Sequence, residues 1–230
     1  QFLQPFTDHA FAVGSVFIID PLYTLPLLLG LLWSGLRARR GVDWRGPNRW
    51  ALVFSCCYLL WSVGAQHQVR SVAQQALAEQ GVPDAQLFVY ATPFNTVLWR
   101  VLAITPTHSY EGFYSLLDQG QHIPLTATQR GQAYLQRWAS VPAVQAMQRF
   151  TQGPIRMELR DGRVLLTDLR MGQESHYSFV FDLGTPAQLD AGQTQPHKVS
   201  AVLSSGLDLA GLVDRMLGRD LRAPAATAHP

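Results

Sequence analysis

The first 66 residues contain two long apolar runs. Residues 16–36 hold Asp20 as their only charged side chain, and residues 50–65 hold none. A helix rises about 1.5 Å per residue, so the first run is long enough to cross a hydrocarbon core of about 30 Å. The second run reaches a comparable length when the side chains that flank it lie at the membrane interfaces. The pattern therefore predicts a transmembrane helical hairpin with spans at about residues 16–36 and 50–66.

The polar residues around these runs predict where the first helix begins and how the hairpin is oriented. Asp20 precedes Pro21, and proline favours the first turn of a helix, so Asp20 is expected to cap the helix start. The segment between the runs holds a single acid, Asp43, and five arginines: Arg37, Arg39, Arg40, Arg45 and Arg49. Short cytoplasmic loops carry such an excess of arginine. Asp20 and the chain after residue 66 are therefore predicted to lie on the periplasmic side.

After residue 66 the periodicity becomes that of a water-soluble domain. Apolar residues recur at helical spacing over residues 69–81, which predicts an amphipathic helix. Segments rich in Phe, Tyr, Val and Leu predict strands at residues 87–91, 97–104 and 109–117. Two short helices are expected at residues 128–138 and 142–150, the second with Pro142 in its first turn.

The clearest β-hairpin surrounds Asp161-Gly162, a dipeptide that suits a two-residue turn and pairs Arg160 with Arg163. This register places Ile155, Met157, Leu159, Val164 and Leu166 on a core face, and Arg156, Glu158, Arg160, Arg163 and Thr167 on a face toward water. The alternating residues Tyr177, Phe179, Phe181 and Leu183 predict a neighbouring strand. The expected fold class is α+β, a transmembrane helical hairpin followed by an antiparallel β-sheet domain with short helices.

Composition divides the chain into three parts. Residues 1–66 form the predicted membrane hairpin, and residues 67–183 form the extramembrane α+β domain. Residues 184–230 are predicted to be a linker, a weak amphipathic helix at residues 207–217 and a flexible tail. The chain starts at Gln1 without a charged leader, so we expect it to be part of a longer protein.

Charge and cysteine usage narrow the classes of function. The net charge is only +2 and the basic residues outside the arginine cluster are scattered, so no nucleic-acid partner is expected. The cluster fits anionic lipid better, which makes a lipid bilayer the expected partner. Cys56 and Cys57 are adjacent, and neighbouring helix side chains diverge. We expect them to be small buried hydrophobes rather than a disulfide or a metal site. No feature of the sequence indicates an oligomeric state.

Three side chains near the first helix carry the donor atoms of a metal site. Asp8, His9 and Asp20 offer carboxylate oxygens and an imidazole nitrogen, which suit zinc, magnesium or manganese. Each residue also has a simpler interpretation. Asp8 suits a turn, His9 an interfacial position and Asp20 a helix cap.

The soluble domain holds three further candidates. Asn95 and Arg100, in the segment TPFNTVLWR, are candidates for binding an anionic substrate, although such a loop more often only turns the chain. Glu111 lies among aromatic residues in SYEGFYSLLD and is a candidate general acid, with an exposed strand position as the alternative. Asp20 and Glu111 are thus the candidate catalytic residues. Neither a GxSxG elbow nor an HExxH motif occurs.

Four blocks, in this order, resemble the YdjM-like family of metal-dependent hydrolases of the bacterial inner membrane: FLQPFTDHAFAVGSVFIIDPLYTLPLLL, TPFNTVLWR, YEGFYSLLD and DGRVLLTDLRMG. The resemblance covers about residues 1–183. It implies a divalent metal that polarises a substrate and generates hydroxide. Asp20 would then be a metal ligand or a carboxylate that hydrogen-bonds to a metal ligand. It also implies that this chain is the C-terminal part, preceded by further membrane helices that hold most of the metal ligands. This part alone would then be inactive.

Three interpretations follow. In the first, the chain is the C-terminal part of a metal-dependent hydrolase that acts at the surface of the bacterial inner membrane. In the second, it is a non-catalytic envelope protein whose β-rich domain binds a partner or lipid. In the third, it is a soluble protein that buries the helical hairpin, which predicts extraction without detergent.

Overall fold

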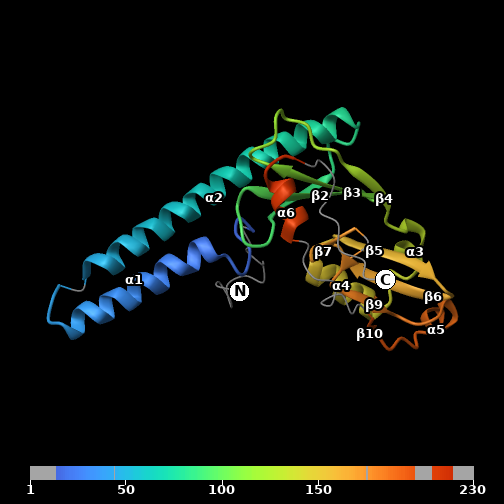
Figure 1. Ribbon diagram of the computed structural model, residues 1–230. Coiled ribbons are helices and arrows are strands. Elements are labelled where there is room, and N and C mark those ends of the chain that lie inside the picture. The colour runs from blue at the N-terminus through green and yellow to red at the C-terminus, as the bar shows by residue number, and fades with distance from the viewer. Residues whose placement is uncertain (1–13, 44, 175, 200–208, 220–230) are drawn as a thin grey trace.

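The computed structural model describes residues 14–43, 45–174, 176–199 and 209–219. Two N-terminal helices form a hairpin that projects from the remainder of the molecule (Figure 1). Two four-stranded antiparallel sheets with short helices follow. The expected α+β fold class is therefore confirmed.

The hairpin consists of α1 (Pro21–Arg39) and α2 (Arg45–Glu79), which pack side by side (Figure 1). The predicted cap is confirmed, because the Asp20 side chain accepts hydrogen bonds from the backbone N–H groups of Leu22 and Tyr23. Helix α2 continues without a break through the segment predicted as a separate amphipathic helix. One helix of 35 residues therefore packs against α1 with its first half and against the first sheet with its second half.

The observed helices divide the apolar runs differently from the predicted spans. Helix α1 begins only at Pro21, so residues 16–19 precede it, and its last turn contains Arg37 and Arg39. Across the described residues, no helix combines the length and the apolar character that a membrane crossing requires.

The first sheet contains β1 (Gln86–Ala91), β2 (Leu98–Ile104), β3 (His108–Ser115) and β4 (Thr126–Gln129), hydrogen-bonded in that order. The three strands predicted between residues 87 and 117 are confirmed. The second half of α2 covers one face of this sheet. There Val69, Ala73 and Ala76 form one core with Val101 and Trp99 of β2.

The second sheet has the order β10-β9-β6-β5. Its strands are β5 (Ile155–Arg160), β6 (Arg163–Asp168), β9 (Val180–Asp182) and β10 (His197–Lys198). The predicted register is confirmed, because Arg160 pairs with Arg163. The predicted third strand is only partly confirmed. Strand β9 pairs with β6, but Tyr177 lies in β8 (His176–Tyr177), which forms a separate ribbon with β7 (Gly172–Gln173).

The two faces of the β5–β6 hairpin differ from the prediction at three positions. Leu159, near the turn, is 45% exposed rather than part of the core. Arg156 and Thr167 are buried rather than hydrated. For Arg156 the reason is tertiary, because its guanidinium lies over the ring of Tyr177 in the β7–β8 ribbon, 5.4 Å from the ring centre.

Four short helices complete the fold: α3 (Gln132–Arg137), α4 (Pro142–Thr151), α5 (Pro186–Asp190) and α6 (Leu209–Met216). Helix α4 and helix α6 confirm two predictions. The helix predicted at residues 128–138 is wrong in its first part, because residues 126–129 form β4 and the following turn passes through Gly131 at a φ of 69°. The predicted linker after residue 184 also holds regular structure, namely α5 and β10.

Arg130 joins the two sheets. Its buried guanidinium donates from Nε to the carbonyl of Ile155 (2.9 Å), and from its terminal nitrogens to the carbonyls of Thr105 (2.6 Å) and Gly153 (2.7 Å). Thr105 follows β2 of the first sheet, Ile155 begins β5 at the edge of the second sheet, and Gly153 lies just before β5. Burial lowers the pKa of Arg130, and the carbonyl oxygens supply the hydrogen bonds that a buried guanidinium needs.

Gly131 is expected to tolerate no side chain. A Cβ there would lie 1.8 Å from the carbonyl oxygen of Met157, and the left-handed φ adds strain. We expect Gly131→Ala to lower the free energy of unfolding by more than about 3 kcal/mol. Gly162→Ala is the matched control, because Gly162 has a φ of 73° with no atom near its missing Cβ. The control should cost about 1–2 kcal/mol. Chemical denaturation followed by circular dichroism measures both, and equal losses would contradict the steric argument.

Candidate functional site

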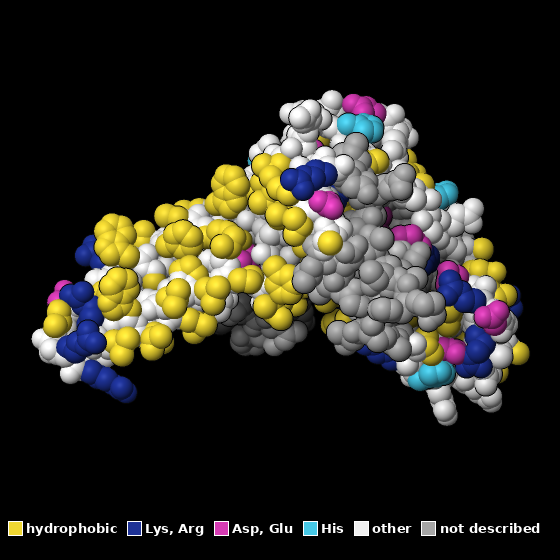
Figure 2. Space-filling model, viewed as in Figure 1, with side chains coloured by type: hydrophobic (Ala, Val, Ile, Leu, Met, Phe, Trp, Pro, Cys, Tyr) yellow, Lys and Arg dark blue, Asp and Glu magenta, His cyan; other side chains and the backbone are white. Residues whose placement is uncertain are grey.

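The outer surface of the α1–α2 hairpin is almost entirely apolar. On the face seen in Figure 2, hydrophobic side chains predominate along the hairpin from the first sheet to the far turn, where basic side chains gather. On α1 the exposed large apolar residues are Leu22, Leu25, Leu28, Leu29, Leu31, Leu32, Trp33 and Leu36. On α2 they are Trp50, Leu52, Val53, Phe54, Leu60, Trp61 and Val63. Soluble monomers rarely expose an apolar surface that extends over one whole helix and half of another.

The contact face between α1 and α2 shows the opposite composition. Gly30 lies so close to α2 that an added Cβ would come within 2.4 Å of the Ala51 side chain. Ser34 is 4% exposed, and its hydroxyl has no hydrogen-bond partner among the described residues. Ser55 donates to the carbonyl of Tyr23 (3.3 Å). Small residues inside and leucines outside invert the arrangement of a helix pair in water.

Cys56 and Cys57 belong to the same surface. Both are free and exposed, so the expectation that they are buried is wrong. The physical reason is that α2 contacts α1 through Ala51 and Ser55, and the two cysteines lie beside that contact instead of within it.

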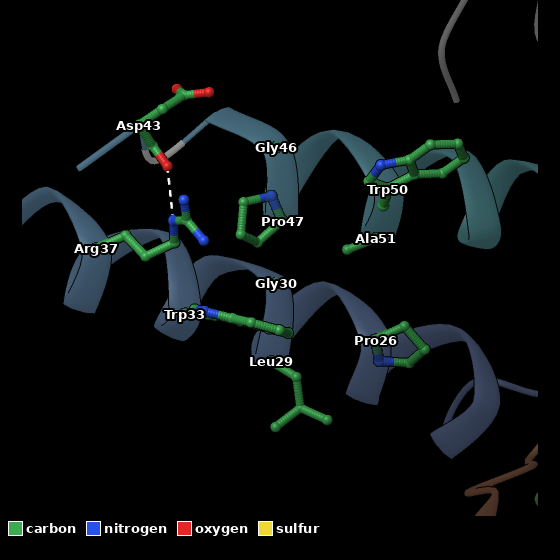
Figure 3. A pocket seen from close by; sticks show the side chains of 10 residues that line it. All are labelled: Pro26, Leu29, Gly30, Trp33, Arg37, Asp43, Gly46, Pro47, Trp50 and Ala51. Atoms are coloured by element: carbon green, nitrogen blue, oxygen red, sulfur yellow. Dashed lines mark hydrogen bonds between the residues drawn. The ribbon is translucent and has the colours of Figure 1, made fainter.

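The far turn of the hairpin is basic and rich in tryptophan. Arg37 donates from Nε to the carbonyl of Asp43 (2.7 Å), and Asp43 accepts at Oδ1 from the backbone N–H of Arg45 (3.1 Å). Trp33 on α1 and Trp50 on α2 flank this turn (Figure 3), and Trp50 is 74% exposed. Arginines in the last turn of α1 also interact favourably with the negative end of the helix dipole.

Asp20 lies at the opposite end of the hairpin and is buried, with 3% of its surface exposed. One carboxylate oxygen caps α1, and the other accepts from the Tyr58 hydroxyl (2.7 Å). That hydroxyl in turn accepts from Thr96 (3.2 Å), in the loop between β1 and β2. Asp20 therefore links both hairpin helices to the first sheet.

The predicted metal site can be examined only at Asp20, since Asp8 and His9 lie outside the described residues. Asp20 fits a metal ligand poorly, because both of its oxygens accept hydrogen bonds from this chain. Within residues 14–43, 45–174, 176–199 and 209–219, no three His, Cys, Asp or Glu side chains gather closely enough to hold an ion. A divalent metal held mainly by residues that precede this chain stays a prediction.

Asn95 shapes the loop that contains it. Its side-chain oxygen accepts from the backbone N–H groups of Val97 (2.9 Å) and Leu98 (2.7 Å), and its amide nitrogen donates to Thr92 (3.0 Å). These bonds account for the buried amide without a substrate. The exposed side chain of this loop is Phe94, which has a φ of 67° and packs edge to face with Phe17.

Arg100 and Glu111, predicted for different roles, form one buried ion pair on neighbouring strands of the first sheet. Nε of Arg100 lies 2.8 Å from Oε1 of Glu111, and Tyr177 donates its hydroxyl to Oε2 (2.8 Å). A terminal nitrogen of Arg100 also donates to the carbonyl of Leu169 (2.9 Å), beyond the end of β6. The exposed strand position considered for Glu111 is therefore wrong.

The electrostatics of this cluster follow from its burial and its partners. Burial opposes the charge of Arg100, but Glu111 outweighs that effect, so the pKa of Arg100 is raised. Burial and the nearby Glu111 carboxylate raise the pKa of Tyr177, which keeps its hydroxyl protonated as a donor. Tyr177 was not a sequence candidate because its place in an alternating run predicted a core residue. The feature that could have identified Tyr177 is its hydroxyl group, since a tyrosine buried in the core needs a hydrogen-bond partner.

The ion pair is expected to matter for stability. Glu111→Gln leaves Arg100 charged and buried without a countercharge, so we expect a loss of about 3 kcal/mol in the free energy of unfolding. Asp214→Asn is the control, because Asp214 pairs with Arg219 where both side chains are exposed, and it should cost about 1 kcal/mol or less. Denaturant titration compares them, and equal losses would show that the buried pair has no special weight.

No family model, no curated protein and no solved structure matches this chain. The YdjM-like resemblance of the four sequence blocks, and the hydrolase activity that it implies, therefore stay predictions.

Proposed function

We propose that the α1–α2 hairpin lies in a lipid bilayer and anchors the two-sheet domain at the membrane surface. The observation that carries this proposal is the inverted distribution of side chains on the hairpin. Leucines and aromatic residues face outward, whereas Gly30, Ser34 and Ala51 face the partner helix. In lipid, apolar side chains on the outer surface of a helix pair carry no free-energy penalty, and small residues between the helices let their backbones pack closely.

The magnitude of the apolar effect favours this environment over water. Each large apolar side chain removed from water contributes roughly 1.5–3 kcal/mol. The exposed residues of α1 and α2 together would make a free hairpin strongly prone to association in water. A bilayer removes the whole surface from water at once, on all sides of the hairpin.

The ends of the hairpin support the same placement. Arginine and tryptophan at the far turn suit the phosphate and interfacial region, and long arginine side chains can reach the headgroups from below. At the other end, Asp20 and Thr96 form a polar boundary beside the first sheet. The apolar part of α1 between Asp20 and Arg37 is short, and bilayers thin locally around such segments at modest cost.

The sidedness follows from the arginines. With Arg37–Arg49 in the cytoplasm, the two sheets lie on the periplasmic side of the bacterial inner membrane. A metal-dependent hydrolase in which this chain is the C-terminal part is the activity that the sequence resemblance implies. The described candidates for catalysis all make structural contacts, so the geometry supports anchoring and presentation of a partner-binding or lipid-binding domain better than catalysis.

Insertion into lipid is tested by flotation with vesicles of phosphatidylcholine. We expect the protein to float with the vesicles and to resist extraction at alkaline pH. Leu28→Lys should weaken this association by about 2.5–3.5 kcal/mol, because it places a charge on the lipid-facing surface. Leu159→Lys is the matched control, since Leu159 is similarly exposed but lies on the second sheet. Recovery of the wild-type protein as a soluble monomer without detergent would contradict the proposal.

The orientation is tested separately with reporters fused after Arg70. We expect alkaline phosphatase, which requires the periplasm, to be active there, and a reporter that requires the cytoplasm to be inactive. The reverse pattern would contradict the orientation and leave the proposed insertion untouched.

A further inference from the structure

A groove lies across the hairpin at its basic end. It has a volume of about 450 Å³ and runs between α1 and the first turns of α2. Its walls are formed mainly by Pro26, Leu29, Trp33, Arg37, Pro47 and Trp50. Figure 3 shows Arg37 reaching toward Pro47, at the end of the groove where the chain turns. The groove thus combines an apolar wall with a single cationic end.

The charge of this end is positive in spite of Asp43. Figure 3 shows the Asp43 carboxylate pointing away from Arg37, whose Nε instead donates to the Asp43 carbonyl. The carboxylate accepts from the backbone N–H of Arg45. Within the described part of the chain, the terminal nitrogens of Arg37 have no hydrogen-bond partner, so they can donate to a ligand oxygen. Arg39, Arg40, Arg45 and Arg49 add positive charge to the same turn.

We propose that this groove binds one acidic phospholipid, with its phosphate at Arg37 and an acyl chain along the wall of Trp33, Leu29 and Pro26. The proposal rests on the insertion of the hairpin proposed above and names the lipid class that its basic end selects. A guanidinium binds phosphate oxygens with paired N–H donors, which an ammonium cannot do. The tryptophans fit the same depth, since indole rings prefer the headgroup level.

Two features favour a lipid over a free phosphate ion. The lining is largely apolar, so an ion alone would leave most of the groove unfilled. The groove also lies between two helices whose outer surfaces are apolar, so a lipid chain in it continues the surrounding hydrocarbon. The positive charge of the turn then favours an acidic headgroup over a zwitterionic one.

The test measures binding of short-chain phosphatidylglycerol and phosphatidylcholine to the detergent-solubilised full chain by native mass spectrometry. We expect phosphatidylglycerol to bind at least about fivefold more tightly, and Arg37→Gln to reduce that affinity about fivefold. Arg39→Gln is the matched control. It also removes one positive charge, but Arg39 lies two residues from Arg37 and does not line the groove. It should change the affinity less than about twofold.

Three outcomes would overturn the proposal. These are equal binding of the two lipids, equal effects of Arg37→Gln and Arg39→Gln, and full competition by glycerol phosphate, which lacks acyl chains. Each would leave the insertion of the hairpin standing, because flotation with phosphatidylcholine vesicles tests insertion without an acidic lipid. If the protein failed to float with the vesicles but still bound phosphatidylglycerol selectively, only the proposed insertion would be contradicted.

Discussion

The packing of the second half of α2 on the first sheet is the interaction on which both parts of the molecule depend. Val69 and Ala73 are fully buried there against β2, and the alanines let the helix lie close to the strands. Helix α2 is continuous, so fixing its second half also fixes the direction in which its first half leaves the domain. The position of the hairpin is therefore set by an ordinary apolar core, although the hairpin's own surface follows the opposite rule.

Hydrogen bonds at the base of the hairpin fix its position relative to the first sheet. Asp20 holds the start of α1 to Tyr58 of α2, and Tyr58 accepts from Thr96 of the first sheet. Gln66 donates to the carbonyl of Val89 (2.9 Å) at the point where α2 reaches the strands. Buried bonds of this kind are costly to break, because each leaves a polar group without water. The hairpin is thus joined rigidly to the domain that it carries.

Buried guanidinium groups connect the remaining parts. Arg130, directly after β4, donates to the carbonyl of Ile155 in β5, and Arg100 of β2 donates to the carbonyl of Leu169, directly after β6. Arg215 of α6 forms a two-bonded ion pair with Asp118 (2.7 and 2.8 Å) and so attaches the C-terminal helix to the first sheet. Each guanidinium has several donors in a fixed plane, which allows one side chain to satisfy carbonyls from separate segments. Two small sheets with limited cores are in this way held as one body.

Much of the local structure was determined by the sequence alone, because it depends on neighbouring residues. The cap at Asp20, the turn at Asp161-Gly162 with its register, and most strands followed from spacing and turn chemistry. The tertiary structure alone decided which polar residues meet. Arg100 and Glu111 were separate candidates and proved to be partners, joined by Tyr177 from 66 residues away. Periodicity cannot report such pairings, since it records which face of an element is apolar but not what the opposite face will contact. The same limit explains why Gly30 and Ser34 became informative only once α2 was seen against them.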